Sequence, residues 1–105
     1  MAIFLTGSTG YLGSYIATGL LRESDARLAL LVRAGSADEA RERLWRSLQL
    51  HMGPEEFLEA LGRIDIYLGD ITLPAVGLTP GDRERLIRTM DSVIHCAASL
   101  NRKIN

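Results

Sequence analysis

The sequence predicts an α/β fold in which helices cover a parallel sheet. Short, nearly continuous apolar runs, as found in strands that are buried on both faces, alternate with segments of helical periodicity. The apolar runs lie at residues 3–5, 28–32, 64–68 and 92–96. Right-handed crossovers then place the strands in the order 3-2-1-4, which is part of a doubly wound sheet of the Rossmann type.

The first strand runs directly into a glycine-rich turn and a helix. The turn comprises Thr6, Gly7, Ser8, Thr9, Gly10, Tyr11, Leu12 and Gly13. Amides at a helix N-terminus have no intrahelical partner and carry partial positive charge, and glycine lets an anion approach them. The sequence therefore predicts a phosphate-binding turn. Its glycine spacing differs by one residue from the G-x-G-x-x-G fingerprint, and the alternative is a tight turn whose glycines serve packing alone.

The helix after this turn is expected to end near Glu23. Its large apolar residues form a stripe at helical spacing: Leu12, Tyr15, Ile16 and Leu20. Gly19 lies inside the helix and lowers helix propensity by about 1 kcal/mol. A close approach to a strand would explain this glycine.

Capping signals predict the remaining helices. Ser36 and Glu39 form a capping box for a helix from Ala37 to about Leu50. A short helix follows at Pro54 and ends at Gly62. The apolar side of the longer helix consists of Ala40, Leu44, Trp45 and Leu48. Its charged residues, Arg41, Arg43 and Arg46 with Glu39 and Glu42, are interpreted as a solvated face.

Thr79 and Pro80 predict the start of the last helix. This helix is expected to reach about Met90 and to direct Leu86, Ile87 and Met90 inward. Residues 73–78 are expected to form a loop.

Polar residues at the ends of the second and third strands are candidate adenosine contacts. Arg33 stands where a dinucleotide site approaches the adenosine ribose, and its guanidinium would bind a 2′-phosphate. A carboxylate there would instead bind a 2′-hydroxyl, so Arg33 predicts NADP rather than NAD. Asp70 could accept the adenine amine, with Ile71 against the ring. The alternatives are a solvated arginine and an aspartate that begins a polar turn.

The fourth strand ends in small residues. Cys96, Ala97 and Ala98 would let the backbone pass close to the nicotinamide ribose and the pyrophosphate. Cys96 is interpreted as a small buried residue rather than a nucleophile, and His95 as a structural histidine rather than a base. His51 is expected at the surface.

Composition excludes several classes. The 105 residues carry a net charge of −1, which gives no electrostatic preference for nucleic acid or an anionic membrane. One cysteine excludes a disulfide framework within the chain, and the two histidines lie far from each other in the sequence, so no metal site is indicated. The N-terminus lacks the features of a signal peptide, and a cytoplasmic location is expected.

These segments resemble the extended short-chain dehydrogenase/reductases, within them the thioester reductase and fatty acyl-CoA reductase branch. Residues 6–13, Arg33, 68–74 and 95–98 carry the resemblance, which spans essentially the whole chain. It implies that NADPH is bound and that its hydride passes to a thioester carbonyl, giving an aldehyde or alcohol. The thioester would be held on a carrier protein or on coenzyme A.

The catalytic set of that branch, a Ser or Thr with a Tyr-x-x-x-Lys pair, cannot be assigned in this sequence. No tyrosine is followed four residues later by a lysine, and the single lysine is Lys103. We therefore expect a fragment: one partial NADP-binding domain without the catalytic part. Its open sheet side beyond the fourth strand would favour self-association. The alternatives are a non-catalytic NADP-binding sensor, or another extended reductase or an epimerase.

Overall fold

The computed structural model describes residues 1–96 and confirms the predicted alternation of strands and helices. The predicted contacts of Ala97 and Ala98 lie outside the described residues. The strands are β1 (Ala2–Thr6), β2 (Arg27–Val32), β3 (Ile64–Leu68) and β4 (Ser92–His95). The α-helices are α1 (Tyr11–Glu23), α2 (Ala37–Leu48), α3 (Pro54–Ala60) and α4 (Pro80–Thr89). None of the helices in this part of the chain is both long and apolar enough to cross a membrane.

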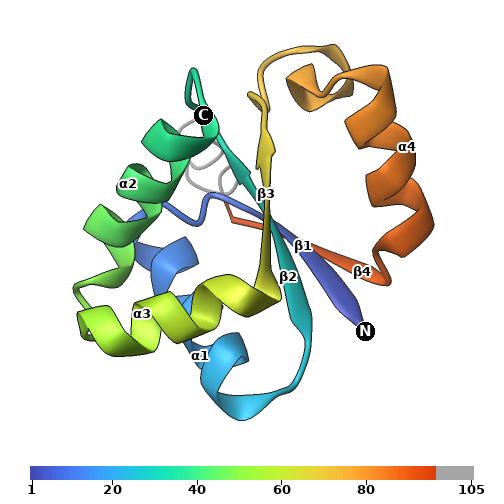
Figure 1. Ribbon diagram of the computed structural model, residues 1–105. Coiled ribbons are helices and arrows are strands. Elements are labelled where there is room, and N and C mark those ends of the chain that lie inside the picture. Colours follow the sequence, from blue (N-terminus) through green and yellow to red (C-terminus); the bar gives the residue numbers. More distant parts are fainter. Residues whose placement is uncertain (97–105) are drawn as a thin grey trace, which may run out of the picture.

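The four strands form one parallel sheet in the predicted order β3-β2-β1-β4. Figure 1 shows α1, α2 and α3 on one face of this sheet and α4 on the other. Among the described residues β4 is an edge strand, and Val93 on it is 50% exposed. Self-association through this side stays a prediction.

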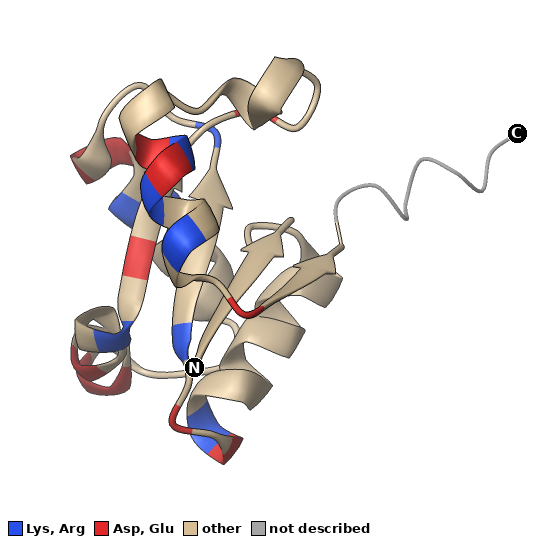
Figure 2. Ribbon diagram, turned by 90° about the vertical axis from the view of Figure 1, so that its right-hand side faces the viewer, with Lys and Arg blue, Asp and Glu red and all other residues tan. Residues whose placement is uncertain are grey.

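The packing face of α1 differs from the predicted stripe. Tyr11 and Tyr15 are 77% and 63% exposed, and Leu12 is also exposed. The buried face instead consists mainly of small residues: Gly13, Ser14, Ala17, Thr18 and Leu21. Ile16 and Leu20 are partly buried against the core, so the predicted stripe packs only in part. At Gly13 the Gly7 backbone lies too close for any side chain. No charged residue interrupts α1 before Arg22, and the helix is accordingly tan over most of its length in Figure 2.

Two further expectations about helical residues are also wrong. No atom of another element lies within 4 Å of a Cβ built on Gly19, so no strand approaches it closely. Ile87 is 59% exposed, because α4 turns Leu86 toward the sheet. Arg85 accompanies Leu86: its Nε donates to the Tyr67 hydroxyl at 3.0 Å, and its guanidinium lies over the Tyr67 ring.

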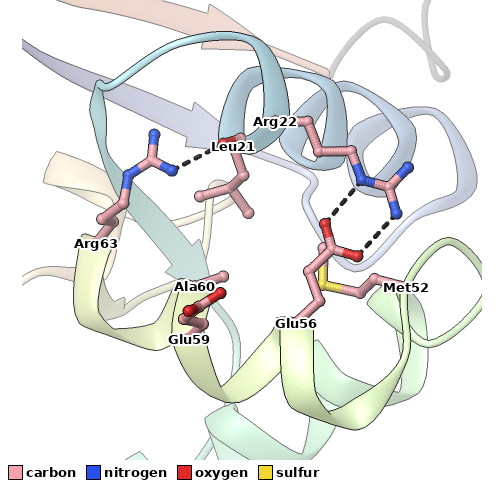
Figure 3. Close-up of a pocket in the computed structure, with 7 residues that line it drawn as sticks. All are labelled: Leu21, Arg22, Met52, Glu56, Glu59, Ala60 and Arg63. Atoms are coloured by element: carbon pink, nitrogen blue, oxygen red, sulfur yellow. Dashed lines mark hydrogen bonds and ion pairs between the residues drawn. The ribbon is translucent and has the colours of Figure 1, made fainter.

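Arginine side chains join the helices at the amino end of the sheet. Arg63 donates to the carbonyl oxygens of Leu21, Ser24 and Ala26, between the end of α1 and the start of β2. Arg22 forms a bidentate ion pair with Glu56 of α3: its Nε donates to Oε2 at 2.8 Å and its Nη2 to Oε1 at 2.9 Å (Figure 3). These contacts fix α3 against the C-terminal end of α1.

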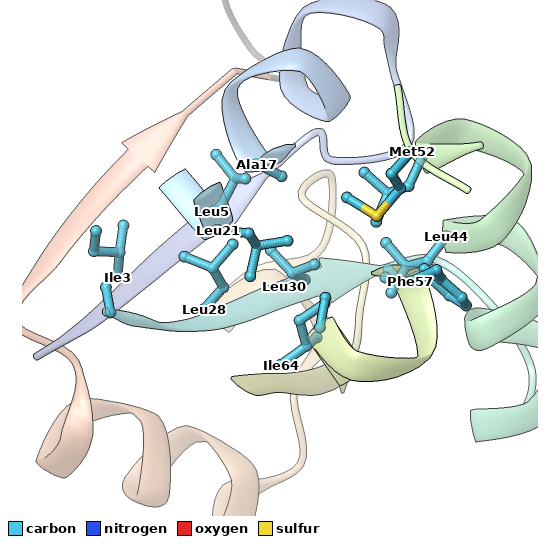
Figure 4. Close-up of a cluster of buried hydrophobic side chains, with 14 of the residues drawn as sticks. Ile3, Leu5, Ala17, Leu21, Leu28, Leu30, Leu44, Met52, Phe57 and Ile64 are labelled. Atoms are coloured by element: carbon cyan, nitrogen blue, oxygen red, sulfur yellow. The ribbon is translucent and has the colours of Figure 1, made fainter. Parts of the chain in front are cut away.

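Each sheet face has its own apolar cluster. The larger cluster joins β1, β2 and β3 to the three helices and includes the residues labelled in Figure 4. In it Ala40, Leu44 and Leu48 of α2 are fully buried, as the helical spacing predicts, and Trp45 packs on Phe57. The smaller cluster, under α4, contains Phe4, Ala29, Leu31, Tyr67 and Leu86. Burial on both faces explains why the β2 sequence is almost continuously apolar.

Candidate functional site

The glycine turn after β1 is shaped by two close approaches. Gly7 has a φ of 80°, which glycine adopts without strain, and its carbonyl oxygen accepts from the Gly10 amide at 3.0 Å. A Cβ on Gly13 would lie only 1.9 Å from the Gly7 carbonyl oxygen. The turn can therefore form only if residue 13 has no side chain.

The N-terminus of α1 has unused hydrogen-bond donors. The Ser14 amide donates to the Gly10 carbonyl at 2.9 Å, whereas the preceding amides, those of Tyr11, Leu12 and Gly13, have no intrahelical acceptor. No side chain among the described residues caps this helix, and its first turn has no acidic residue.

The other α-helices in residues 1–96 all compensate their N-termini. Ser36 and Thr79 cap α2 and α4, and acidic residues lie in the first turns of α2, α3 and α4. Of the α-helices in this range, α1 alone has an uncompensated positive end, which could accept an external anion.

The polar residues of the turn differ in their contacts. Ser8 is fully buried, and its Oγ has no hydrogen-bond partner among residues 1–96. Such a hydroxyl is unfavourable, and the predicted contact of Ser8 with a phosphate stays a prediction. Thr6 Oγ1 lies 2.7 Å from His95 Nδ1, and the Thr9 carbonyl accepts from Ser47 Oγ of α2 at 2.8 Å. Thr6 and Thr9 thus help to fix the turn in place.

A hollow of about 380 Å³ extends from Gly7 and Thr9 to the ends of β2 and β3. Its charged lining consists of Arg33, Arg43 and Asp70, and Ile71 also lines it. Arg43 was not predicted as a site residue, because helical spacing alone marks it as one of several solvated arginines on α2. The one signal for it is positional: it lies on the helix that follows Arg33 directly in the sequence.

Asp70 is held in an Asx turn. Its Oδ1 accepts from the Thr72 amide and hydroxyl at 2.9 and 2.7 Å, while Oδ2 lies 3.7 Å from Arg33 Nη1. The Thr72 amide is the main cause of a lowered Asp70 pKa, followed by the Thr72 hydroxyl, and Arg33 adds a smaller effect. Asp70 thus lies beside Arg33 at the hollow, and its predicted contact with adenine stays a prediction.

A second hollow, of about 230 Å³, lies on the other side of the turn. It shares Gly7 and Thr9 with the first hollow and is also lined by the α1 N-terminus and Cys96. Cys96 is buried as predicted, and burial raises the pKa of its thiol, which disfavours the nucleophilic thiolate. His95 is exposed at its place beside Thr6.

Another cavity lies at the opposite end of the sheet, between α1 and α3 (Figure 3). Its arginines and Glu56 already bind one another or backbone carbonyls, so we interpret these residues as structural contacts between α1 and α3 rather than as a ligand site. His51 is not simply at the surface: its Nε2 lies 3.1 Å from Ser14 Oγ, and its ring contacts Tyr11 and Tyr15. Among the described residues, no group of three or more His, Cys, Asp or Glu could hold a metal.

The parallel sheet and the uncompensated helix N-terminus at its carboxyl edge define a Rossmann-type nucleotide-binding domain. Residues 5–104 match the family described as male sterility protein, and the chain belongs to that family. A putative fatty acyl-CoA reductase from Drosophila melanogaster is 35% identical over 94% of this chain and 20% of that protein. Together with the reductase domains described below, it confirms the predicted resemblance to thioester and fatty acyl-CoA reductases.

Known relatives are much longer than this chain. A linear gramicidin synthase from Brevibacillus parabrevis is 39% identical over 101 residues, which are 95% of this chain but 2% of that protein. The reductase domain of a nonribosomal peptide synthetase from Mycobacterium tuberculosis shares 38% sequence identity with this chain, and its crystal structure superimposes with a TM-score of 0.78 over 92% of this chain. The terminal R domain of the myxalamid biosynthetic pathway is 34% identical, with a TM-score of 0.79 over 90% of this chain. The chain covers 24% of each of these two domains.

Proposed function

We propose that this chain is the NADPH-binding portion of a reductase that converts an acyl thioester to an aldehyde or an alcohol. The thioester would be carried on a carrier protein or on coenzyme A. One observation carries the cofactor assignment: the glycine turn that leads into the free α1 N-terminus also lines a hollow that contains Arg33 and Arg43. The reductase domains among its relatives support the reaction class.

Each part of the site would then hold one part of the cofactor. The free amides of Tyr11, Leu12 and Gly13 would bind the pyrophosphate, because they are donors without an intrahelical acceptor at a positive helix end, and the predicted contact of Ser8 would add to them. The guanidinium groups of Arg33 and Arg43 would bind the 2′-phosphate.

The remaining contacts concern the two ends of the cofactor. Ile71 and Asp70 would border the adenine. Cys96 would lie on the nicotinamide side of the turn, where it lines the second hollow. The contacts of Ala97 and Ala98 with the cofactor stay predictions from the sequence. When bound, NADPH would supply the hydride for reduction.

Proton donation requires groups that residues 1–105 do not contain. The sequence has no Tyr-x-x-x-Lys pair. We propose that the proton donor and the acyl-binding surface come from sequence outside this chain, and that this chain holds and orients the cofactor.

Calorimetric titration of the 105-residue chain tests the cofactor assignment. Adenosine 2′,5′-bisphosphate should bind at least roughly tenfold more tightly than adenosine 5′-monophosphate, because charge-assisted hydrogen bonds to the 2′-phosphate are strong. Arg33→Ala and Arg43→Ala should each remove most of this difference, whereas Arg46→Ala on the same helix should not. Equal wild-type affinities for the two nucleotides would contradict the NADP assignment.

A further inference from the structure

Helix α2 contains two ion pairs with the same spacing but different surroundings. Glu39 Oε2 lies 3.3 Å from Arg43 Nη2, and Glu42 Oε2 lies 3.2 Å from Arg46 Nη2. Both pairs join residues four apart on a solvent-facing surface. Of the two arginines, only Arg43 also lines the hollow that contains Arg33.

The Glu39 carboxylate is fixed through both of its oxygens. Oε1 accepts from the Gly35 amide at 2.8 Å, and Oε2 accepts from Nε and Nη2 of Arg43 at 3.4 and 3.3 Å. The predicted capping box is therefore shifted: the Glu39 amide donates to Ser36 Oγ, but the return bond goes to Gly35. Glu39 thus connects the turn that follows Arg33 to Arg43.

This arrangement keeps a negative charge beside the hollow. The Gly35 amide, and after it Arg43, lowers the pKa of Glu39, so the carboxylate stays ionised at neutral pH. A phosphate that accepts hydrogen bonds from Arg43 shares that guanidinium with Glu39. The two anions then lie well within the screening length of about 8–10 Å at physiological salt and repel each other.

We propose that Glu39 tunes cofactor preference through Arg43: its negative charge offsets part of the charge of Arg43, which limits the preference for a 2′-phosphate over a 2′-hydroxyl. Asp70 is the corresponding carboxylate beside Arg33. The inference rests on the proposed NADP-binding function.

Glu39→Gln separates charge from structure, because glutamine keeps an oxygen acceptor for the Gly35 amide and loses the negative charge. Glu42→Gln is the matched control, with the same change in net charge on the same helix. The readout is the ratio of affinities for adenosine 2′,5′-bisphosphate and adenosine 5′-monophosphate, measured by calorimetry at about 0.1 M salt. Glu39→Gln should raise this ratio roughly threefold, and less at high salt, whereas Glu42→Gln should leave it unchanged.

The outcomes distinguish this inference from the proposed function. The role of Glu39 is overturned if the affinity ratio is unchanged or lower in Glu39→Gln, or if it rises equally in both variants. NADP binding is still supported in that case, provided that the wild type binds adenosine 2′,5′-bisphosphate more tightly than adenosine 5′-monophosphate. A wild type that binds both nucleotides equally overturns the proposed function, and the role of Glu39 with it.

Discussion

Replacing Gly13 by alanine is expected to disrupt the glycine turn and its binding of phosphate. The new Cβ would lie 1.9 Å from the Gly7 carbonyl oxygen and 2.5 Å from the Gly7 carbonyl carbon. Real Cβ contacts are essentially never shorter than 3.0 Å, so the turn and the helix must separate by roughly 1 Å. The contacted atoms belong to the backbone and cannot rotate away.

The expected magnitude follows from two opposing effects. Alanine is favoured over glycine inside a helix by about 1 kcal/mol. Overpacking a tight contact costs about 1–3 kcal/mol or more, and here the clash is with backbone. Because the clash is with backbone, we expect the cost to outweigh the gain, with a net loss of up to about 2 kcal/mol in the free energy of unfolding. Affinity for adenosine 2′,5′-bisphosphate should fall at least roughly tenfold, because the free amides of α1 move away from the position of the phosphate.

Gly19→Ala provides a matched control on the same helix. A Cβ on Gly19 meets no atom of another element within 4 Å, so this variant should gain about 1 kcal/mol of stability and bind normally. Urea unfolding followed by circular dichroism, with calorimetric titration of the nucleotide, measures both effects. The reasoning is refuted if Gly13→Ala matches the wild type in stability and affinity, or if Gly19→Ala weakens binding as much as Gly13→Ala does.

Two other predictions concern the loop after β3. Ala75 is exposed and has a φ of 54°, so Ala75→Gly should raise the free energy of unfolding by about 0.5–1 kcal/mol in urea titrations; a loss of stability would show that this conformation is not strained. The Asp70 pKa is lowered on folding, so its stabilising effect is present above the ordinary pKa of an aspartate and is lost as the pH falls through the lowered value. NMR titration should find this low pKa, and Asp70→Asn should weaken the acid dependence of stability; an Asp70 that titrates in its ordinary range would contradict the contacts with Thr72.

The strands and their order could be predicted because one physical constraint determines them. A strand between two helical layers must be apolar on both faces, which leaves short apolar runs such as 28–32 in the sequence. Alternating helices and right-handed crossovers then allow few topologies, and the strand order followed. Local signals were equally direct at Ser36 and Thr79, whose side chains cap the helices as predicted.

Contacts between distant segments could not be predicted in this way. Arg43 and Arg46 have the same local pattern, and only the folded chain shows that Arg43 lines the hollow with Arg33. Ile87 and Leu86 are neighbours of similar hydropathy, and only the folded chain shows that Leu86 faces the sheet, beside the contact of Arg85 with Tyr67. Which helix residues face the sheet or the hollow depends on how the helix is oriented against its neighbours, and sequence periodicity does not specify that orientation.

The error on α1 has a direct bearing on the proposed function. Large apolar residues mark the packing face of a helix only where the spacing between helix and sheet leaves room for large side chains. Here the small residues Gly13, Ala17 and Thr18 form the contact, and they let the start of α1 lie against the Gly7 backbone. That close contact also places the free amides of the helix beside the end of β1, where a phosphate could reach them. The small residues of this helix face and the proposed phosphate site therefore belong to one feature, which leaves Tyr11 and Tyr15 exposed.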